Sequence, residues 1–214
     1  MSRDRLRHQC GDGADRGREG VHRPSSAGSA AAGPALEGQQ IEKGMLASPG
    51  TISDVRIKEN GWESWVLDEA YIPQQGDMVD PADGTLVSAG KCHGRAQGVT
   101  GTGVVAALDS GIRSGLIKMP TILTQDHLLH FQDGMYITEA DVAEAGKAIG
   151  ALRAGYLTLM REAGLWIEDV PISFMSGASG LYVDARKAQR IGMVSPGSGR
   201  IIQFGNTSLA MAKE

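Results

Sequence analysis

The chain has 214 residues, of which 41% are hydrophobic and 21% are charged, as in soluble globular proteins that bury a core as one domain. Its formal net charge of −4 gives no reason to expect nucleic-acid binding, and no apolar run is long enough to span a membrane, so a cytoplasmic protein is expected. Cys10 and Cys92 are too few and too far apart for a disulfide framework or a metal site of clustered thiolates.

The first structured elements are expected in the stretch from residue 29 to residue 90. Residues 29–47 place small residues before a short helical turn, and residues 61–69 alternate loosely, as in a strand. Residues 74–90 contain Pro81 and the pair Asp83-Gly84, which predict a hairpin or meander.

Residues 100–117 predict a helix with one buried face. The apolar residues that share this face are Val104, Val105, Leu108, Ile112 and Leu116. The preceding glycines of "GVTGTG", residues 98–103, lack the lysine of a phosphate-binding loop, so close helix packing with a polar cap is the better interpretation.

Residues 128–164 predict a hairpin followed by the longest helix of the chain. The pair Asp133-Gly134 between two apolar runs favours a two-residue hairpin turn. Thr138 is expected to cap the helix and Gly164 to end it. Its apolar face contains Val142, Ala145, Ile149, Leu152, Tyr156, Leu159 and Met160.

Residues 170–214 predict strands that alternate with helices, which indicates an α/β architecture. A buried strand is expected in residues 170–177, a short helix capped by Asp184 follows, and a strand beginning at Arg200 breaks at Gly205 into a final helix.

Candidate binding residues lie in the glycine turn "FMSGASG", residues 174–180. Backbone without side chains at the carboxyl end of a strand lets a ligand lie against the main chain, although a tight turn is the commoner outcome. Glu144 and Lys147 on the long helix form either a solvated ion pair or an edge beside a nucleotide. The histidines His93, His127 and His130 show no matched carboxylate in the sequence, which therefore supports neither a metal site nor a catalytic triad.

Five blocks in the same order resemble the reductive activases of corrinoid proteins, and most closely the activators of methylamine methyltransferase corrinoid proteins in methanogens. The blocks are "SAAAGPALEGQQI", "GVTGTGVVAAL", "ITEADVAEAGKAIGALRAGYLTLMREAGL", "FMSGASGLYVDARKAQRIGMV" and "FGNTSLAMA". The resemblance implies an actin-like ATPase fold, mainly its second lobe, in residues 27–214. It also implies ATP with magnesium as cofactor, a corrinoid protein as partner, and a reaction that returns cobalt(II) corrinoid to cobalt(I). A dimer is left open.

The resemblance assigns nucleotide binding to specific positions. The adenosine turn corresponds to Gly177, Ala178, Ser179 and Gly180. Glu144 and Lys147 correspond to a helix beside the adenine and ribose, Gly205 to the hinge-like closing helix, and Glu37 to a position beyond the second phosphate loop. No catalytic residue is assigned.

Three features expected of the family are not found in this sequence: the first phosphate loop, the second phosphate loop before Ser29, and the iron–sulfur module. The resemblance therefore implies a fragment that is inactive alone. A docking module for a corrinoid protein without enzymatic activity and a relative of the actin-like kinases are the alternatives.

The first 26 residues are expected to be a non-native or disordered segment. A shift of one base lets the codons of Arg7 to Arg23 encode GTNAEMALIVDGKVFTA, a glycine-threonine turn followed by an alternating strand. A native disordered arm that touches RNA or an acidic partner is the weaker alternative. If the segment replaces a phosphate-binding strand, the strand beside it should be left with an exposed edge.

This hypothesis predicts the DNA sequence of the gene. The codons of Arg7 to Arg23 should spell the phosphate-binding strand in the shifted frame. Sequencing the gene tests this directly, and a codon whose fixed bases forbid the shifted string would rule it out.

Overall fold

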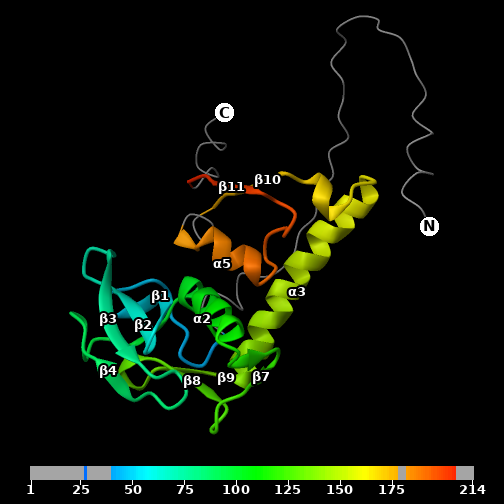
Figure 1. Cartoon of the computed structure of the whole chain (residues 1–214). Coiled ribbons are helices and arrows are strands. Elements are labelled where there is room, and N and C mark those ends of the chain that lie inside the picture. The colour runs from blue at the N-terminus through cyan, green and yellow to red at the C-terminus, as the bar shows by residue number, and fades with distance from the viewer. Residues whose placement is uncertain (1–26, 28–39, 178–181, 206–214) are drawn as a thin grey trace, which may run out of the picture.

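The computed structural model describes residue 27, residues 40–177 and residues 182–205. Its largest layer is a five-stranded sheet with the order β4-β3-β2-β1-β5 (Figure 1). The strands are β1 (Thr51–Lys58), β2 (Gly61–Leu67), β3 (Pro73–Val79), β4 (Leu86–Ser88) and β5 (Gly98–Val99). The first four pair antiparallel in chain order, and β5 pairs parallel with β1. The strand predicted in residues 61–69 and the meander predicted in residues 74–90 are therefore confirmed.

Helix α2 (Gly101–Arg113) packs against β1. Thr100 caps it, because its side chain accepts a hydrogen bond from the Gly103 N–H at 3.1 Å. A Cβ at Gly103 would lie 2.3 Å from the Ile52 carbonyl oxygen and 2.8 Å from Val99 Cγ1. The expectation of close helix packing with a polar cap is confirmed, and the missing side chain of Gly103 is what permits the close approach.

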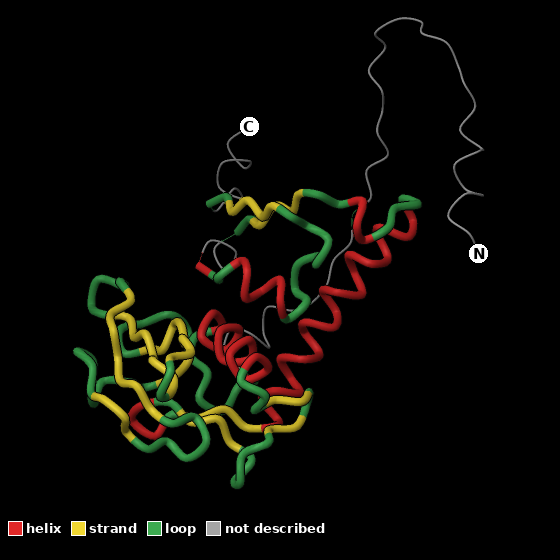
Figure 2. Tube along the Cα trace, viewed as in Figure 1, coloured by secondary structure: helices red, strands yellow, loops and turns green. Residues whose placement is uncertain are grey.

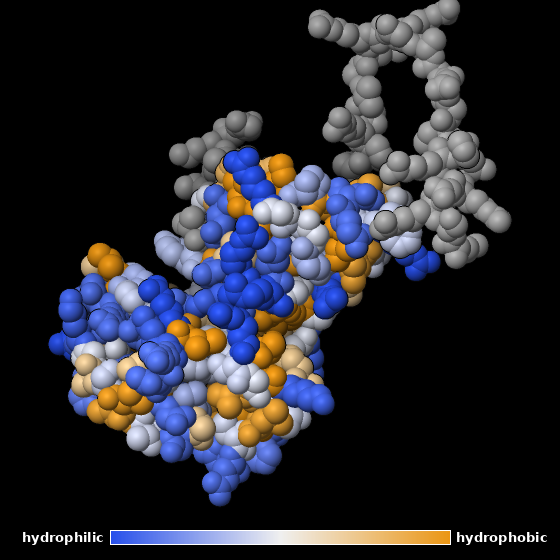
Figure 3. Space-filling view, in the orientation of Figure 1, coloured by the Kyte–Doolittle hydropathy of each residue, from blue (hydrophilic) through white to orange (hydrophobic). Residues whose placement is uncertain are grey.

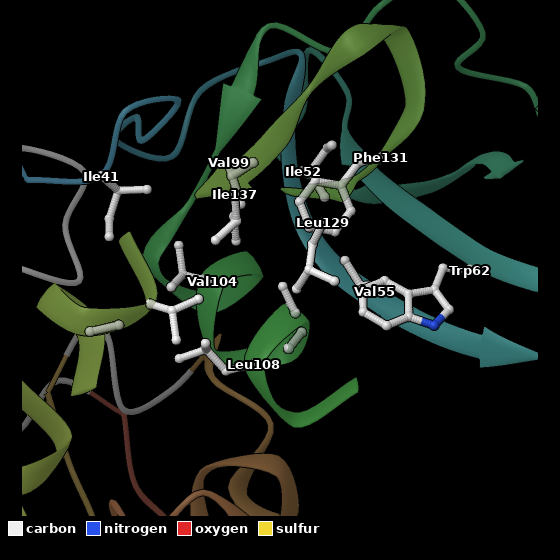
Figure 4. Packing of buried hydrophobic residues seen from close by; sticks show 14 of the residues in the cluster. Ile41, Ile52, Val55, Trp62, Val99, Val104, Leu108, Leu129, Phe131 and Ile137 are labelled. Carbon is white, nitrogen blue, oxygen red and sulfur yellow. The ribbon is translucent and has the colours of Figure 1, made fainter. Parts of the chain in front are cut away.

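The hydrophobic core lies between α2, the inner face of the sheet and a small hairpin (Figure 4). Val104 and Leu108 of α2 are buried and belong to one cluster with Ile52 and Val55 of β1. Trp62 stacks on Phe131 with ring centroids 6.2 Å apart.

The small hairpin pairs β8 (Leu128–His130) with β9 (Tyr136–Thr138). Between them, in a 3₁₀ turn (Gln132–Gly134), Asp133 and Gly134 have φ values of 56° and 70°. The Met135 N–H donates to the Gln132 carbonyl at 3.1 Å. These are the features of the predicted two-residue turn, which is confirmed. A second hairpin pairs β6 (Ile117–Lys118) with β7 (Thr121–Ile122).

Helix α3 (Glu139–Glu162) is the predicted long helix. Thr138 caps it as expected, and Asp141 completes a reciprocal capping box with the Thr138 backbone. Gly164 follows the end of the helix with φ 66°, which favours glycine. The apolar face is buried at Val142, Ala145, Ile149 and Met160. Among the described residues no helix, α3 included, is long and apolar enough to cross a membrane.

The segment after α3 contains a 3₁₀ turn (Ile167–Asp169), β10 (Ile172–Met175), α5 (Ala185–Arg190) and β11 (Arg200–Gln203) (Figure 2). Strands β10 and β11 pair parallel. The side chain of Asp184 accepts hydrogen bonds from the backbone N–H groups of Arg186 and Lys187 at 2.9 Å. The predicted strands and the predicted helix with its Asp184 cap are confirmed. The final helix predicted after Gly205 lies outside the described residues.

Two predictions about burial are wrong. Ile112 is 42% exposed, and Leu116 follows the end of α2 at Arg113, because the turn at Ser114 and Gly115 stops the helix before its last predicted apolar position. Strand β10 is also not buried, since Ile172 and Phe174 are exposed. Within the described residues this strand pairs only with β11; the exposed edge expected beside a replaced strand stays a prediction.

Helix packing at Gly103 leads to a prediction about stability. Gly103→Ala should lower the free energy of unfolding by about 1–3 kcal/mol, since the added methyl group meets the backbone of β1. Urea unfolding followed by tryptophan fluorescence measures the change.

Gly150→Ala on α3 is the matched control, because Gly150 is an exposed helical glycine with no atom within 4 Å of an added Cβ. It should stabilise the protein by about 0.5–1 kcal/mol through helix propensity. Equal effects of the two substitutions would contradict the proposed role of Gly103.

Candidate functional site

The carboxyl ends of β10 and β11 bring two of the candidate residues to the same edge of the parallel pair. Met175 pairs with Gln203, and Gly177 and Gly205 each lie two residues beyond these positions. Gly177 has φ 97°, and none of the described residues places an atom within 4 Å of a Cβ at Gly177 or at Gly205. Ligands of open α/β sheets bind outside the carboxyl ends of the strands, where backbone can approach them closely. The two glycines therefore have the placement that a ligand-binding turn needs.

Exposed aromatic side chains lie beside this edge, a feature that the sequence analysis missed. Phe174 stacks on Phe204 with ring centroids 5.6 Å apart and an interplanar angle of 29°. The side chains remain exposed, as does Tyr182, and hydrophobic residues are visible at this end of the molecule (Figure 3). Parallel sheets are normally covered on both faces. This small sheet therefore has an apolar face that the described residues leave open.

Two ion pairs hold α5 in place behind the turn. The Arg190 guanidinium donates to both carboxylate oxygens of Asp109 on α2, at 2.6 and 2.7 Å, and Asp109 is 1% exposed. The same hydrogen bonds raise the pKa of Arg190, so it stays protonated. The Lys187 ammonium donates to an Asp54 carboxylate oxygen and to the Val55 carbonyl oxygen of β1. Helix α5 is thus connected to the main core through charged hydrogen bonds.

Glu144 and Lys147 form an ion pair with each other on α3. Lys147 is mostly exposed, and the pair lies in the second and third turns of the helix, whose beginning contacts β7 and β9. No contact described for residues 40–177 and 182–205 joins this pair to Gly177 or Gly205. The solvated ion pair is the arrangement seen, and a role beside a nucleotide stays a prediction.

The other candidates lie outside the described residues. They are Ala178, Ser179 and Gly180 of the turn, and Glu37 near the N-terminus. Their assignment also stays a prediction. Of the two cysteines, Cys92 is buried and forms no disulfide within the described residues, and Cys10 lies outside them.

The expectation that the histidines lack matched carboxylates is wrong. His93 Nδ1 lies 2.7 Å from Asp77 Oδ2, His127 Nδ1 lies 3.2 Å from Glu139 Oε1, and His130 Nε2 lies 2.7 Å from Asp126 Oδ2. The partners of His93 and His127 are 16 and 12 residues away in sequence. Folding brings them together, so spacing alone could not show them, whereas the i,i+4 pair Asp126 and His130 was visible in the sequence.

One histidine belongs to a larger cluster. Asp77, His93 and Asp133 each place a possible ligand atom within 4.8 Å of the other two. The Asp77 carboxylate raises the pKa of His93, through its hydrogen bond first and its charge second. Three separate segments contribute to this cluster: β3, the loop before β5 and the turn between β8 and β9.

Comparisons with known proteins point to one group. A family model described as "C-terminal domain of RACo the ASKHA domain" matches residues 21–214. A Methanosarcina barkeri protein described as a Co(II) methylated amine-specific corrinoid protein reductase is 48% identical over 187 residues, which are 87% of this chain and 34% of that protein. A solved structure described as a reductive activator for corrinoid, iron–sulfur protein matches with a TM-score of 0.60 and 25% identity, over 86% of this chain and 29% of that one. The chain therefore spans about a third of the length of these relatives.

The Asp109–Arg190 pair gives a second prediction. Arg190→Ala should lower the free energy of unfolding by about 3 kcal/mol, because among the described residues it leaves the buried Asp109 carboxylate with only the 3.7 Å contact to Arg113. Chemical unfolding measures the loss.

Lys147→Ala is the control, since it also removes the cation of an ion pair but from an exposed site. This change should stay within about 0.5 kcal/mol of the parent protein. If Arg190→Ala were equally mild, the pair would not be what holds α5 to α2.

Proposed function

Since the chain belongs to the family of the RACo C-terminal ASKHA domain, whose fold is that of the actin-like ATPases, we propose that it is a nucleotide-binding lobe of a reductive activator of corrinoid proteins. In the complete activator, ATP hydrolysis would drive the return of a cobalt(II) corrinoid to cobalt(I). The partner would be the corrinoid protein of a methylamine methyltransferase system. The observation that carries this proposal is the placement of Gly177 and Gly205 just beyond the carboxyl ends of neighbouring parallel strands, with no described residue crowding either glycine.

The arrangement of this edge suits the flat part of a nucleotide. A positive φ at Gly177 turns the backbone away from β10 without a side chain over the edge, so that an adenosine can lie against the main chain. The rings of Phe174 and Phe204 stack on each other nearby and offer an apolar, planar surface. ATP with magnesium is therefore the proposed ligand, with Ala178, Ser179 and Gly180 as further contacts and Glu144, Lys147 and Glu37 as weaker candidates.

Coupling to a partner requires that the nucleotide favour one arrangement of the lobe over another. Helix α5 is the element through which this would act, because its N-cap Asp184 lies four residues after Gly180 in the sequence and Arg190 connects it to α2. A change at the turn would thus reach the core through a single short helix.

The chain by itself is proposed to bind nucleotide weakly and not to hydrolyse it. Hydrolysis needs donors preorganised around the phosphates and a positioned metal ion, which the missing phosphate loops would supply. Electron delivery needs an iron–sulfur module, and the two isolated cysteines of the sequence cannot hold one. Both parts would come from the remaining two thirds of the complete activator.

A docking module without enzymatic activity is the second candidate. It is favoured by the exposed Phe174 and Phe204, whose rings stack on each other, because exposed apolar groups that lie together are typical of surfaces that bind another protein. The two candidates differ in whether this chain binds ATP. Calorimetric titration with ATP and with a methylamine methyltransferase corrinoid protein separates them.

The nucleotide proposal predicts a specific effect at the turn. The parent chain should bind ATP without releasing phosphate, and Gly177→Ala should weaken binding at least tenfold, about 1.4 kcal/mol, because a side chain at positive φ distorts the turn. Calorimetry gives the affinity, and a phosphate-release assay checks for hydrolysis.

Gly164→Ala is the matched control, since Gly164 also has positive φ and no atom of the described residues within 4 Å of a Cβ but follows the end of α3. It should leave ATP affinity unchanged. No ATP binding by the parent chain, or an equal loss in both variants, would refute the proposed site.

A further inference from the structure

The buried Asp77 carboxylate forms no ion pair with a lysine or arginine of the described residues. Four carboxylate residues among the described ones are at least nine-tenths buried: Glu63, Asp77, Asp109 and Asp141. Glu63 pairs with Lys58, Asp109 with Arg190, and Asp141 caps the N-terminus of α3. Asp77, at 1% exposed, has only the imidazole of His93 as a charged partner within the described residues.

Buried charges in proteins are paired or coordinate metal ions. The second carboxylate of the cluster adds to the negative charge, because no lysine or arginine of the described residues forms an ion pair with Asp133. A single histidine that is 58% exposed in its side chain therefore faces two carboxylates. This excess of negative charge favours a bound cation.

The ligand atoms have the types and the spacing that a transition-metal ion needs. Imidazole nitrogen and carboxylate oxygens bind Zn²⁺ at about 2.0–2.2 Å, which places neighbouring ligand atoms about 3.0–3.5 Å apart. His93 Nδ1 and Asp77 Oδ2 are 2.7 Å apart, and all three groups lie within 4.8 Å. Binding of an ion would require His93 Nδ1 and Asp77 Oδ2 to separate by a few tenths of an ångström, and His93 is 58% exposed in its side chain.

Backbone hydrogen bonds hold both carboxylates in position. Asp77 Oδ1 accepts from the Gly90 N–H at 2.8 Å. Asp133 Oδ1 accepts from the Gly94 N–H at 2.9 Å, and Oδ2 accepts from the Ala96 N–H and from Gln132 Nε2 at 2.7 and 2.9 Å. Such outer contacts orient metal ligands, and each oxygen with a single donor keeps a lone pair for an ion.

We propose that Asp77, His93 and Asp133 form a binding site for a divalent first-row transition-metal ion. The ion replaces the proton that His93 Nδ1 shares with Asp77 and leaves its remaining positions to water. It fastens the loop of residues 89–97 to β3 and to the turn between β8 and β9. The site is separate from the glycine turn and does not depend on the function proposed for it.

Titration with Zn²⁺ tests the proposal on the full chain after removal of any affinity tag. The parent for this experiment carries His8→Asn, Cys10→Ser and His22→Asn, since these N-terminal side chains are alternative Zn²⁺ ligands. Calorimetry should show one ion per chain, and His93→Ala should weaken binding at least tenfold. Excess Zn²⁺ should raise the Tm of the parent and not that of His93→Ala.

His127→Ala is the matched control, because His127 is similarly exposed and has a carboxylate partner, Glu139, but belongs to no cluster of three among the described residues. It should bind Zn²⁺ as the parent does. When Co²⁺ is added instead, its visible absorption should appear in the parent and in His127→Ala and should be weaker in His93→Ala. Failure of the parent to bind Zn²⁺ at millimolar concentration, or equal affinity in the parent and His93→Ala, would overturn the proposal.

Discussion

The close approach of α2 to β1 is the constraint on which the other contacts depend. Gly103 has no side chain, so the helix lies directly against the Ile52 carbonyl group. This position lets Val104 and Leu108 fill the core on one side, and it points Asp109 toward α5. A single helix thus supports both the five-stranded sheet and the smaller parallel pair. Because protein interiors are closely packed, the five-stranded sheet and the parallel pair have little freedom to move independently of each other.

The parallel pair β10–β11 needs contacts with other elements to be stable. Two strands with an apolar face that the described residues leave open bury little surface, and isolated two-stranded units are marginally stable. Here α5 and its two ion pairs with the main core hold the pair in place. The strand predicted to be buried is exposed because the described residues leave that face of the small sheet uncovered.

Local chemistry accounts for most predictions that were confirmed. The Thr138 and Asp184 caps and the Asp133-Gly134 turn each depend on hydrogen bonds between residues close in sequence. The histidine partners were missed for the opposite reason. Asp77, His93 and Asp133 span more than 50 residues and three segments, and their proximity follows only from the way the hairpin packs beside the sheet.

The sequence by itself determined the family, the order of the elements, their caps and turns, and the candidate glycines at 177 and 205, because these follow from short-range patterns and from ordered blocks. The tertiary structure decided which carboxylates meet which cations. Arg190 pairs with Asp109, which is 81 residues away in the sequence, and Asp77 pairs with His93. It also decided that the face of β10 stays exposed. These long-range pairs and the exposed face of β10 depend on which surfaces folding brings together, so no local pattern could have fixed them.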